Sequence, residues 1–128
     1  MKAKFTVALA MVGGFAVGAA AIEGLHAQAT AAGYVIAEVT VKDPEKYKAE
    51  FVPPATKAIR EAGGKYIVQG GKNISFEGEP PAPRVVVFQF DSIDKAQAWW
   101  NSQGRKDADA IGNKYATFRV YAAEGVPQ

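Results

Sequence analysis

The stretch YVIAEVTVKDPEKY, residues 34–47, contains one predicted strand and the start of a predicted helix. Residues 34–41 are rich in β-branched side chains, which favour a strand. The odd-numbered positions form a uniformly apolar face, whereas the even-numbered positions are mixed and include a carboxylate. The first set is Val35, Ala37, Val39 and Val41, and the second is Tyr34, Ile36, Glu38 and Thr40. Such a strand covers a core with one face and leaves a more selective surface on the other.

A helix is predicted directly after this strand. Asp43 can accept hydrogen bonds from the free backbone amides of a helix start, and Pro44 suits the first helical position. Apolar residues then recur at helical spacing, and Gly63–Gly64 ends the pattern. Because a proline nitrogen cannot donate a hydrogen bond, Pro53–Pro54 predicts a kink or a split of the helix near Phe51–Val52.

Three further stretches have the composition of strands. They are KYIVQ at residues 65–69, RVVVFQF at residues 84–90, which is the most apolar, and TFRVYAAEGV at residues 117–126. Gly70–Gly71 indicates a bend or bulge, and residues 73–78 are a candidate continuation of the second strand toward a hairpin tip.

A second helix is predicted between the last two strands, over SIDKAQAWWNS at residues 92–102. Asp91 or Ser92 is the candidate cap. Residues 105–115 that follow are expected to be a helical or irregular connection.

The resulting order, β-α-β-β-α-β, is the ferredoxin-like arrangement of the α+β class. Its natural packing is one four-stranded antiparallel sheet with two helices on one face. The opposite sheet face then needs cover, because it includes Tyr34, Ile36 and parts of the strands at 84–90 and 117–123. Formation of a homodimer through that face is the simplest solution.

Residues 1–29 have the parts of a secretory signal peptide. Lys2 and Lys4 give a positive start, residues 5–22 are apolar or glycine except for Thr6, and A-Q-A at 27–29 is a small-x-small site. Cleavage after Ala29 would leave one domain, residues 30–128, in the periplasm or outside the cell. A retained membrane anchor is the alternative, because the apolar run approaches the roughly 20 residues that span a bilayer.

Composition excludes several function classes. The only histidine, His26, lies in the predicted leader and the chain has no cysteine. Proximal-histidine haem, Cys/His zinc, thiol nucleophiles and Ser-His-Asp triads therefore each lack an essential member. Residues 30–128 hold 13 basic and 12 acidic side chains, a net charge of +1, with no basic cluster longer than a pair. We expect no cofactor, no metal and no nucleic-acid partner.

Several stretches together resemble the bacterial family called domain of unknown function 1330. They are GYVIAEVTVKDPEKY, the QGG after KYIVQ, PRVVVFQF, and AQAWWNS with FRVYAAEGV. The resemblance covers residues 33–126 and implies a ferredoxin-like subunit that forms a dimeric α/β barrel. It implies no assigned activity. Related dimeric α/β barrels include haem enzymes and cofactor-free monooxygenases, and the missing histidine disfavours the haem version.

The chain departs from the family pattern at three places. Gln69 stands where members often have Arg before the Gly-Gly pair, and Gln89 stands where an acidic residue is frequent. Gln103-Gly104-Arg105 replaces a frequent P-E-Y after the tryptophan element. We expect these changes near the cavity, so any shared chemistry transfers poorly.

Glu38 and Arg119 are the candidate catalytic residues. Burial would raise the pKa of a carboxyl in the middle of a strand, which suits a general base, although a salt bridge on the sheet rim is the structural alternative. Arg84 and Arg119 could hold a carboxylate through a planar fork, either that of a ligand or that of Glu38.

The remaining candidates are predicted to bind a ligand. They are two tyrosines that could line a cleft, a polar residue of the third strand and a segment at the end of the second helix: Tyr34, Tyr47, Gln89, Trp100, Asn101 and Ser102. Trp99 and Trp100 cannot both face the core, so one of them is expected to line the pocket or the dimer seam. A core role for the aromatic residues and a capping role for Asn101 and Ser102 are the alternatives.

We therefore expect an exported homodimer that binds a small apolar or aromatic molecule in a barrel cavity. A cofactor-independent enzyme of the monooxygenase or isomerase type is one alternative. A structural or interaction module without a ligand is the other. A solvated cavity with a Glu38–Arg pair would favour the enzyme, and an apolar cavity without such a pair would favour binding.

Overall fold

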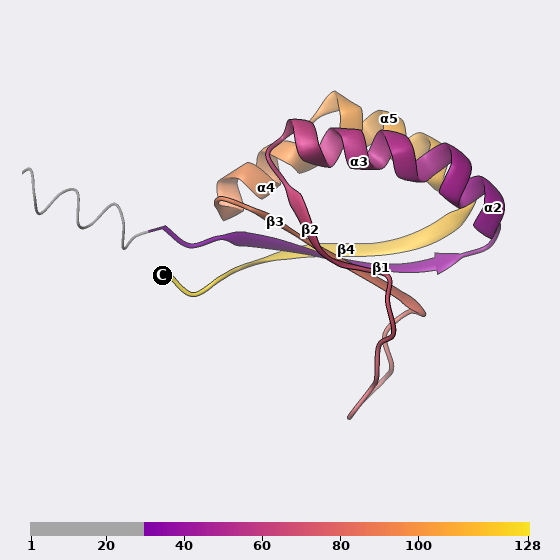
Figure 1. Cartoon of the computed structure of the whole chain (residues 1–128), viewed down its shortest axis with the longest axis horizontal. Helices are drawn as coiled ribbons and strands as arrows, with labels where there is room; N and C mark the ends of the chain where they lie inside the picture. Colours follow the sequence, from indigo (N-terminus) through magenta and orange to yellow (C-terminus); the bar gives the residue numbers. More distant parts are fainter. Residues whose placement is uncertain (1–29) are drawn as a thin grey trace, which may run out of the picture. The chain divides into compact units, whose positions relative to one another are not determined.

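The architecture is one four-stranded sheet with all of its helices on one face (Figure 1). It is seen in a computed structural model that describes residues 30–128. The predicted signal peptide, residues 1–29, lies outside these described residues. Residues 31–126 form a single compact unit.

The sheet consists of β1 (Gly33–Val41), β2 (Lys65–Gln69), β3 (Arg84–Phe90) and β4 (Ala116–Glu124). The strand order is β2-β3-β1-β4, and every neighbouring pair is antiparallel. β1 occupies a central position, with Glu38 opposite Val85 on one side and opposite Arg119 on the other. The predicted α+β, ferredoxin-like sheet is confirmed, because β1 and β2 lie on either side of β3 and are connected by helices.

Two helical segments cross the sheet, and the second contains one helix more than predicted. The first segment runs through α2 (Pro44–Lys46), the π-helix η1 (Tyr47–Phe51) and α3 (Val52–Glu61). The second contains α4 (Ile93–Trp100) and α5 (Gln103–Gly112). The connection predicted over residues 105–115 is thus mostly helical, because Ser102 accepts a hydrogen bond from the Arg105 amide (3.2 Å) and begins a new helix.

The predicted caps of the first two helical segments are present. Asp43 Oδ1 accepts from the Lys46 amide at 3.2 Å, and Ser92 Oγ accepts from the Lys95 amide at 3.2 Å. The Pro53–Pro54 pair does not break the first segment. Instead, the hydrogen-bond pattern widens to a π-helix immediately before it, at residues 47–51, and the prolines lie in the first turn of α3, where a missing donor is tolerated.

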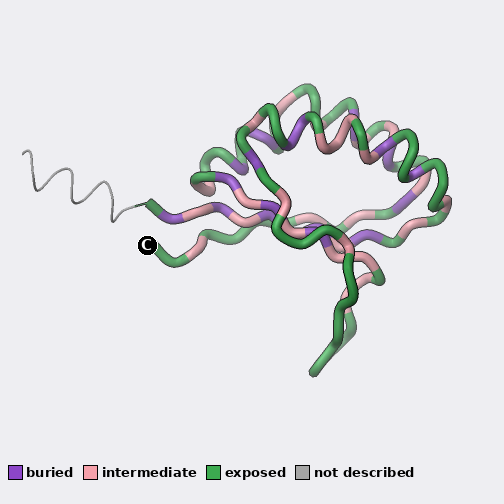
Figure 2. Tube along the Cα trace, in the orientation of Figure 1, coloured by how far each residue is buried: buried purple, intermediate pink, exposed green. Residues whose placement is uncertain are grey.

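The core lies between the sheet and the helices (Figure 2). Odd positions of β1 point into it, as the alternation of that strand predicts, and even positions of β3 point into it as well. Its aromatic centre is a cluster in which Phe88 packs edge-on against Trp99, with ring centroids 5.0 Å apart, and against Phe90 at 5.9 Å. These buried rings fix the distance between the sheet and α4.

Residues 70–83 form a long exposed connection between β2 and β3 that projects away from the sheet (Figure 1). The expected continuation of the strand over residues 73–78 is wrong, because no strand is present between Gln69 and Arg84. The segment contains three prolines without a donor for a sheet ladder, and Gly70 adopts a positive φ of 77° that ends the strand. Phe76 in this segment is 92% exposed.

Candidate functional site

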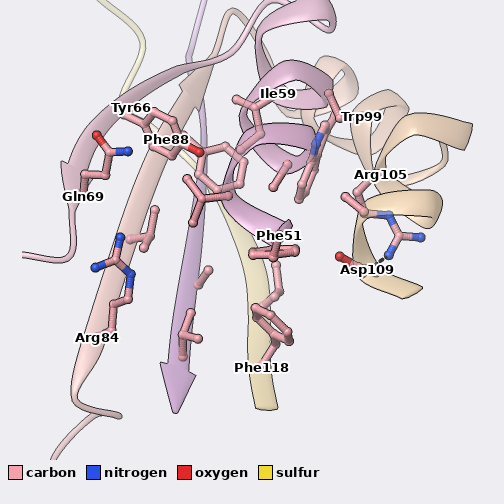
Figure 3. A pocket seen from close by; sticks show the side chains of 18 of the residues that line it. Phe51, Ile59, Tyr66, Gln69, Arg84, Phe88, Trp99, Arg105, Asp109 and Phe118 are labelled. Atoms are coloured by element: carbon pink, nitrogen blue, oxygen red, sulfur yellow. Dashed lines mark hydrogen bonds and ion pairs between the residues drawn. The ribbon is translucent and has the colours of Figure 1, made fainter. Parts of the chain in front are cut away.

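A cavity lies between the inner face of the sheet and the helices (Figure 3). Its volume is about 70 Å³ and it is partly open to solvent. One water molecule needs about 10–15 Å³ of such space, so the cavity holds several water-sized groups. Most of its wall is apolar and comes from both layers, including Phe51, Ile59, Val86, Phe88, Trp99 and Phe118.

One side of the cavity carries polar side chains. Arg84, the first residue of β3, lies on the same face as Val86 and Phe88 and lines the cavity together with Gln69. The Arg84 Cζ atom lies 5.7 Å from the centroid of the Tyr47 ring. The Arg84 Nε atom is buried and has no hydrogen-bond partner, and no carboxylate within residues 30–128 forms an ion pair with this guanidinium.

Gly70 makes room for the Arg84 side chain. A Cβ atom built on Gly70 would lie 2.1 Å from Nη1 and 2.4 Å from Cζ of Arg84. The positive φ of this residue also disfavours any side chain other than hydrogen. The Gly70 amide donates to the Val85 carbonyl at 2.9 Å, so the turn is attached to the strand that carries Arg84.

Tyr47 is the second polar group near this guanidinium. Burial raises the pKa of the Tyr47 phenol above its ordinary value of 10.0, and the nearby positive charge of Arg84 offsets part of that rise. The phenol is therefore protonated at neutral pH, and it can donate a hydrogen bond.

The opposite side of the cavity has an arginine that is paired with a carboxylate (Figure 3). Arg105 Nη1 donates to Asp109 Oδ2 at 2.5 Å, and Arg105 Nε donates to the Trp100 carbonyl at 2.7 Å. Its guanidinium also covers the Trp100 ring, with Cζ 3.7 Å from the centroid. Asp109 is the only carboxylate in the cavity wall formed by the described residues, and Arg105 already neutralises it.

A second unsatisfied donor belongs to the cavity wall. The indole Nε1 of Trp99 is buried without a hydrogen-bond partner, although the rest of the ring packs tightly against Phe88 and Phe90. Unpaired buried donors are rare in folded proteins, because each costs about 1–3 kcal/mol. Both of these donors belong to residues that line the cavity, Arg84 and Trp99.

The structure separates the sequence candidates into two groups. Tyr47, Arg84 and Trp100 line the cavity. Glu38, Arg119, Tyr34 and Gln89 instead lie on the outer face of the sheet, where Tyr34 is opposite Gln89 and Glu38 is opposite Arg119. Gln89 does not line the cavity between the sheet and the helices, because odd positions of β3 point away from the core.

Glu38 and Arg119 form an ion pair across adjacent strands. Arg119 Nη1 lies 2.5 Å from Glu38 Oε2, and Glu38 Oε1 accepts a hydrogen bond from the Ala82 amide at 3.3 Å. The Glu38 side chain is 15% exposed and that of Arg119 is 69% exposed. In this position the carboxylate attaches the end of the 70–83 segment to the sheet and does not face the cavity.

The other two candidates lie at the junction between α4 and α5. Asn101 is the C-cap of α4, and Ser102 is the N-cap of α5, with its hydroxyl donating to the Trp99 carbonyl at 2.7 Å. Neither lines the cavity. The capping interpretation thus accounts for both residues.

Gln69 and Arg105, two of the departures from the family pattern expected near a cavity, line this one together with Tyr66 and Asp109. Gln69 reaches the inner face because the ladder between β2 and β3 shifts by one residue between Tyr66 and Val68. The spacing of Arg105 and Asp109, four residues apart, was the available signal for an ion pair on a helix. Tyr66 is held by a hydrogen bond of 2.8 Å between its hydroxyl and that of Thr56.

Within residues 30–128 no three histidine, cysteine or acidic side chains gather closely enough to hold a metal ion. In the same residues no helix combines the length and the apolar character needed to cross a bilayer.

Fold and site together define a ferredoxin-like α+β protein with a small cavity between its sheet and its helices. The chain belongs to the family described as a domain of unknown function, DUF1330, which matches residues 32–126. No curated protein matches the chain significantly.

Solved structures support the same fold. A protein of unknown function from Rhodopseudomonas palustris is 14% identical, with a TM-score of 0.58 over 77% of this chain and 83% of that one. The methylated form of the same protein is 13% identical, with a TM-score of 0.57 over 73% and 80% of the two chains. A conserved protein from Bacteroides thetaiotaomicron, described as a possible oxidoreductase, is 12% identical, with a TM-score of 0.49 over 73% and 97%. At these identities the first two similarities support the fold alone, and the third carries no argument.

Proposed function

We propose that this protein binds a small apolar or aromatic molecule in the cavity between the sheet and the helices. The observation that carries the proposal is an apolar cavity of about 70 Å³ whose wall contains two buried donors without partners, Arg84 Nε and Trp99 Nε1. Ligand sites typically combine a mostly apolar wall with a few polar groups that orient the ligand.

Binding is favoured over a reaction that depends on a carboxylate base. The Glu38–Arg119 pair, which was the main candidate for such chemistry, lies on the outer sheet face. Asp109, the one carboxylate in the described cavity wall, is held by Arg105. Burial raises the pKa of Tyr47 further above its ordinary value of 10.0, so its phenol is protonated at neutral pH, is no base there, and can donate a hydrogen bond.

Toluene is a suitable neutral probe for this proposal. Ala55 lines the cavity, so Ala55→Leu would fill part of the space with three extra carbon atoms. Ala98 is an exposed helical alanine outside the cavity, and Ala98→Leu is the matched control. Toluene should raise the thermal midpoint of the native protein and of Ala98→Leu, and should have little effect on Ala55→Leu. Equal effects of toluene on all three proteins would contradict the proposal.

We also propose that the outer sheet face forms the interface of a homodimer. Its apolar side chains include Tyr121, which is 45% exposed, and Val68, which is 42% exposed. The Glu38–Arg119 pair is neutral as a unit, so a second copy can approach it without like-charge repulsion. The test is sedimentation at micromolar concentration, where a monomer would contradict this interface.

Export is the remaining part of the proposal, and it is supported by the leader pattern of residues 1–29. Native mass spectrometry of protein purified from the periplasm measures both the first residue of the chain and the number of chains in the assembly. The expected species is a dimer of chains that start at Thr30. Chains that still start at Met1 would indicate a retained anchor.

A further inference from the structure

We propose that the molecule bound in this cavity is a small organic carboxylate, with its anionic group held by Arg84. This inference rests on the proposed binding function and names the chemical class of the ligand. The carboxylate would supply acceptors for a guanidinium that has no acidic partner within residues 30–128. The apolar or aromatic body would occupy the space lined by Val86, Phe88 and Trp99.

The first argument is a comparison of Arg84 with the two arginines that form ion pairs. Arg105 is paired with Asp109, and Arg119 is paired with Glu38, each at 2.5 Å. Arg84 is the one of the three without a carboxylate, although it is the one whose Nε atom is buried without a partner. Guanidinium groups are strong, planar donors that match a carboxylate with two parallel hydrogen bonds. A guanidinium that lies beside a cavity without a carboxylate is therefore a site for an external anion.

The second argument is that the fold keeps a place for this guanidinium. The missing side chain at Gly70 leaves the space that Nη1 and Cζ of Arg84 occupy, since a Cβ atom there would lie 2.1 and 2.4 Å from them. The ring of Tyr47 lies on another side, 5.7 Å from Arg84 Cζ. Both neighbours limit the rotation of the side chain, so the donors are held at the cavity before a ligand arrives.

The third argument is the order of side chains along β3. Arg84, Val86 and Phe88 share the inner face, and alternate residues of a strand are about 6.6–6.8 Å apart. A ligand that contacts Arg84 with its charged group therefore extends over two apolar positions toward the Phe88–Trp99 cluster. This length suits a short chain or a single ring attached to a carboxylate.

Charge favours a monoanion over a larger phosphate group. The described wall has two guanidinium groups and one carboxylate, so pairing of Arg105 with Asp109 leaves one positive charge. A single carboxylate neutralises that charge. A dianionic phosphate would add an excess negative charge against an apolar wall, which is costly without further donors.

Benzoate and benzamide are the probes, because they have the same shape and differ in charge. Binding is measured by calorimetry and by tryptophan fluorescence with the native protein, Arg84→Met and Arg60→Met. Arg60 is an exposed arginine of α3 outside the cavity, so its variant is the matched control. Sulfate is titrated as an anion without an apolar body, and toluene as an apolar body without polar groups.

The expected result is that benzoate binds more tightly than benzamide. A charge-assisted pair of hydrogen bonds is worth about 10- to 100-fold in affinity, so Arg84→Met should lose that factor for benzoate. The same variant should leave toluene binding within about twofold, and Arg60→Met should change neither.

Three results would overturn the inference, and they separate it from the proposed function. Equal binding of benzoate and benzamide, unchanged in Arg84→Met, would exclude carboxylate recognition while the apolar site remains. Sulfate that binds at Arg84 as tightly as benzoate would indicate a general anion site. If benzoate, benzamide and toluene all fail to bind, the proposed function is wrong as well.

Discussion

The two faces of the sheet differ in whether their charged side chains have a partner of opposite charge. On the outer face, Glu38 and Arg119 neutralise each other across adjacent strands, and Arg119 remains largely in water. On the inner face, Arg84 is brought beside an apolar cavity without an acidic partner in the described residues. Pairing the inner arginine with a carboxylate would make the fold more stable, because an unpaired buried donor costs free energy. The difference supports the proposal that the inner face binds a ligand.

The largest effect is expected from removing the aromatic centre of the inner face. Phe88→Ala should lower the free energy of unfolding by about 3–5 kcal/mol, since Phe88 contacts the rings of Tyr66, Phe90 and Trp99. Val87→Ala, one residue along on the outer face, should cost less than about 1 kcal/mol at low protein concentration. Urea denaturation measures both values.

Protein concentration makes this pair of variants more informative. If the outer face is a dimer interface, the cost of Val87→Ala should grow as the concentration rises, because association stabilises the native state. The cost of Phe88→Ala should not show this dependence. Equal losses for both variants at low concentration would mean that the two faces are packed alike.

Alkaline pH should lower the free energy of unfolding, because the buried Tyr47 phenol then loses its proton. Its pKa is raised in the folded protein, mainly by burial, above the ordinary value of 10.0. The folded state therefore keeps its proton at a pH where the unfolded chain has lost it. This contribution is complete below pH 10 and is lost as the pH rises through the folded pKa, by at most about 1.4 kcal/mol per pH unit.

Tyr47→Phe tests this assignment, because it removes the titrating hydroxyl and keeps the ring. The variant should lose stability less steeply than the native protein between pH 9.5 and higher values, in the window set by the pKa of 10.0 and above. Denaturation at a series of pH values gives the two slopes. Identical slopes would show that Tyr47 titrates as it does in the unfolded chain.

Arg84 should contribute to binding at the expense of stability. In the ligand-free protein, Arg84→Met should raise the free energy of unfolding by about 1 kcal/mol, since it removes a buried unpaired donor and keeps an adaptable apolar side chain. Arg60→Met should stay within about 0.5 kcal/mol of the native protein. A lower free energy of unfolding in Arg84→Met would indicate that the guanidinium stabilises the ligand-free fold, which contradicts this prediction.

The fold was predictable because apolar residues alternate regularly in β1 and the β3 segment is almost wholly apolar. The bounds of β2 and β3 match the predicted ranges, and those of β1 and β4 differ by one or two residues. α5 was harder to predict, since its buried residues, Ala108 and Gly112, are small and give little hydrophobic signal. Its beginning depends on a Ser102 cap that follows directly on α4.

The site was predictable only in part, for geometric reasons. Arg84 and Tyr47 were candidates from the sequence, and both line the cavity. Strand alternation alone does not place Gln69 on the inner face, because the irregular pairing between Tyr66 and Val68 reverses the side on which the later residues of β2 lie. The sequence of β1 alone made Glu38 a catalytic candidate. Only the register between β1 and β4 shows that Arg119 is opposite it.

The smallest effect is expected on the outer face, from Glu38→Gln. Glutamine keeps an acceptor for the Ala82 amide but loses the ion pair with Arg119, whose side chain is 69% exposed. Pairs with an exposed partner contribute about 0.2–1 kcal/mol, and salt screens them, so the loss should be within this range and should shrink in salt. A double-mutant cycle with Arg119→Met in urea isolates this coupling. Benzoate affinity should not change in Glu38→Gln, because the carboxylate lies on the face opposite the cavity; a marked change would show that the two faces are coupled through β1.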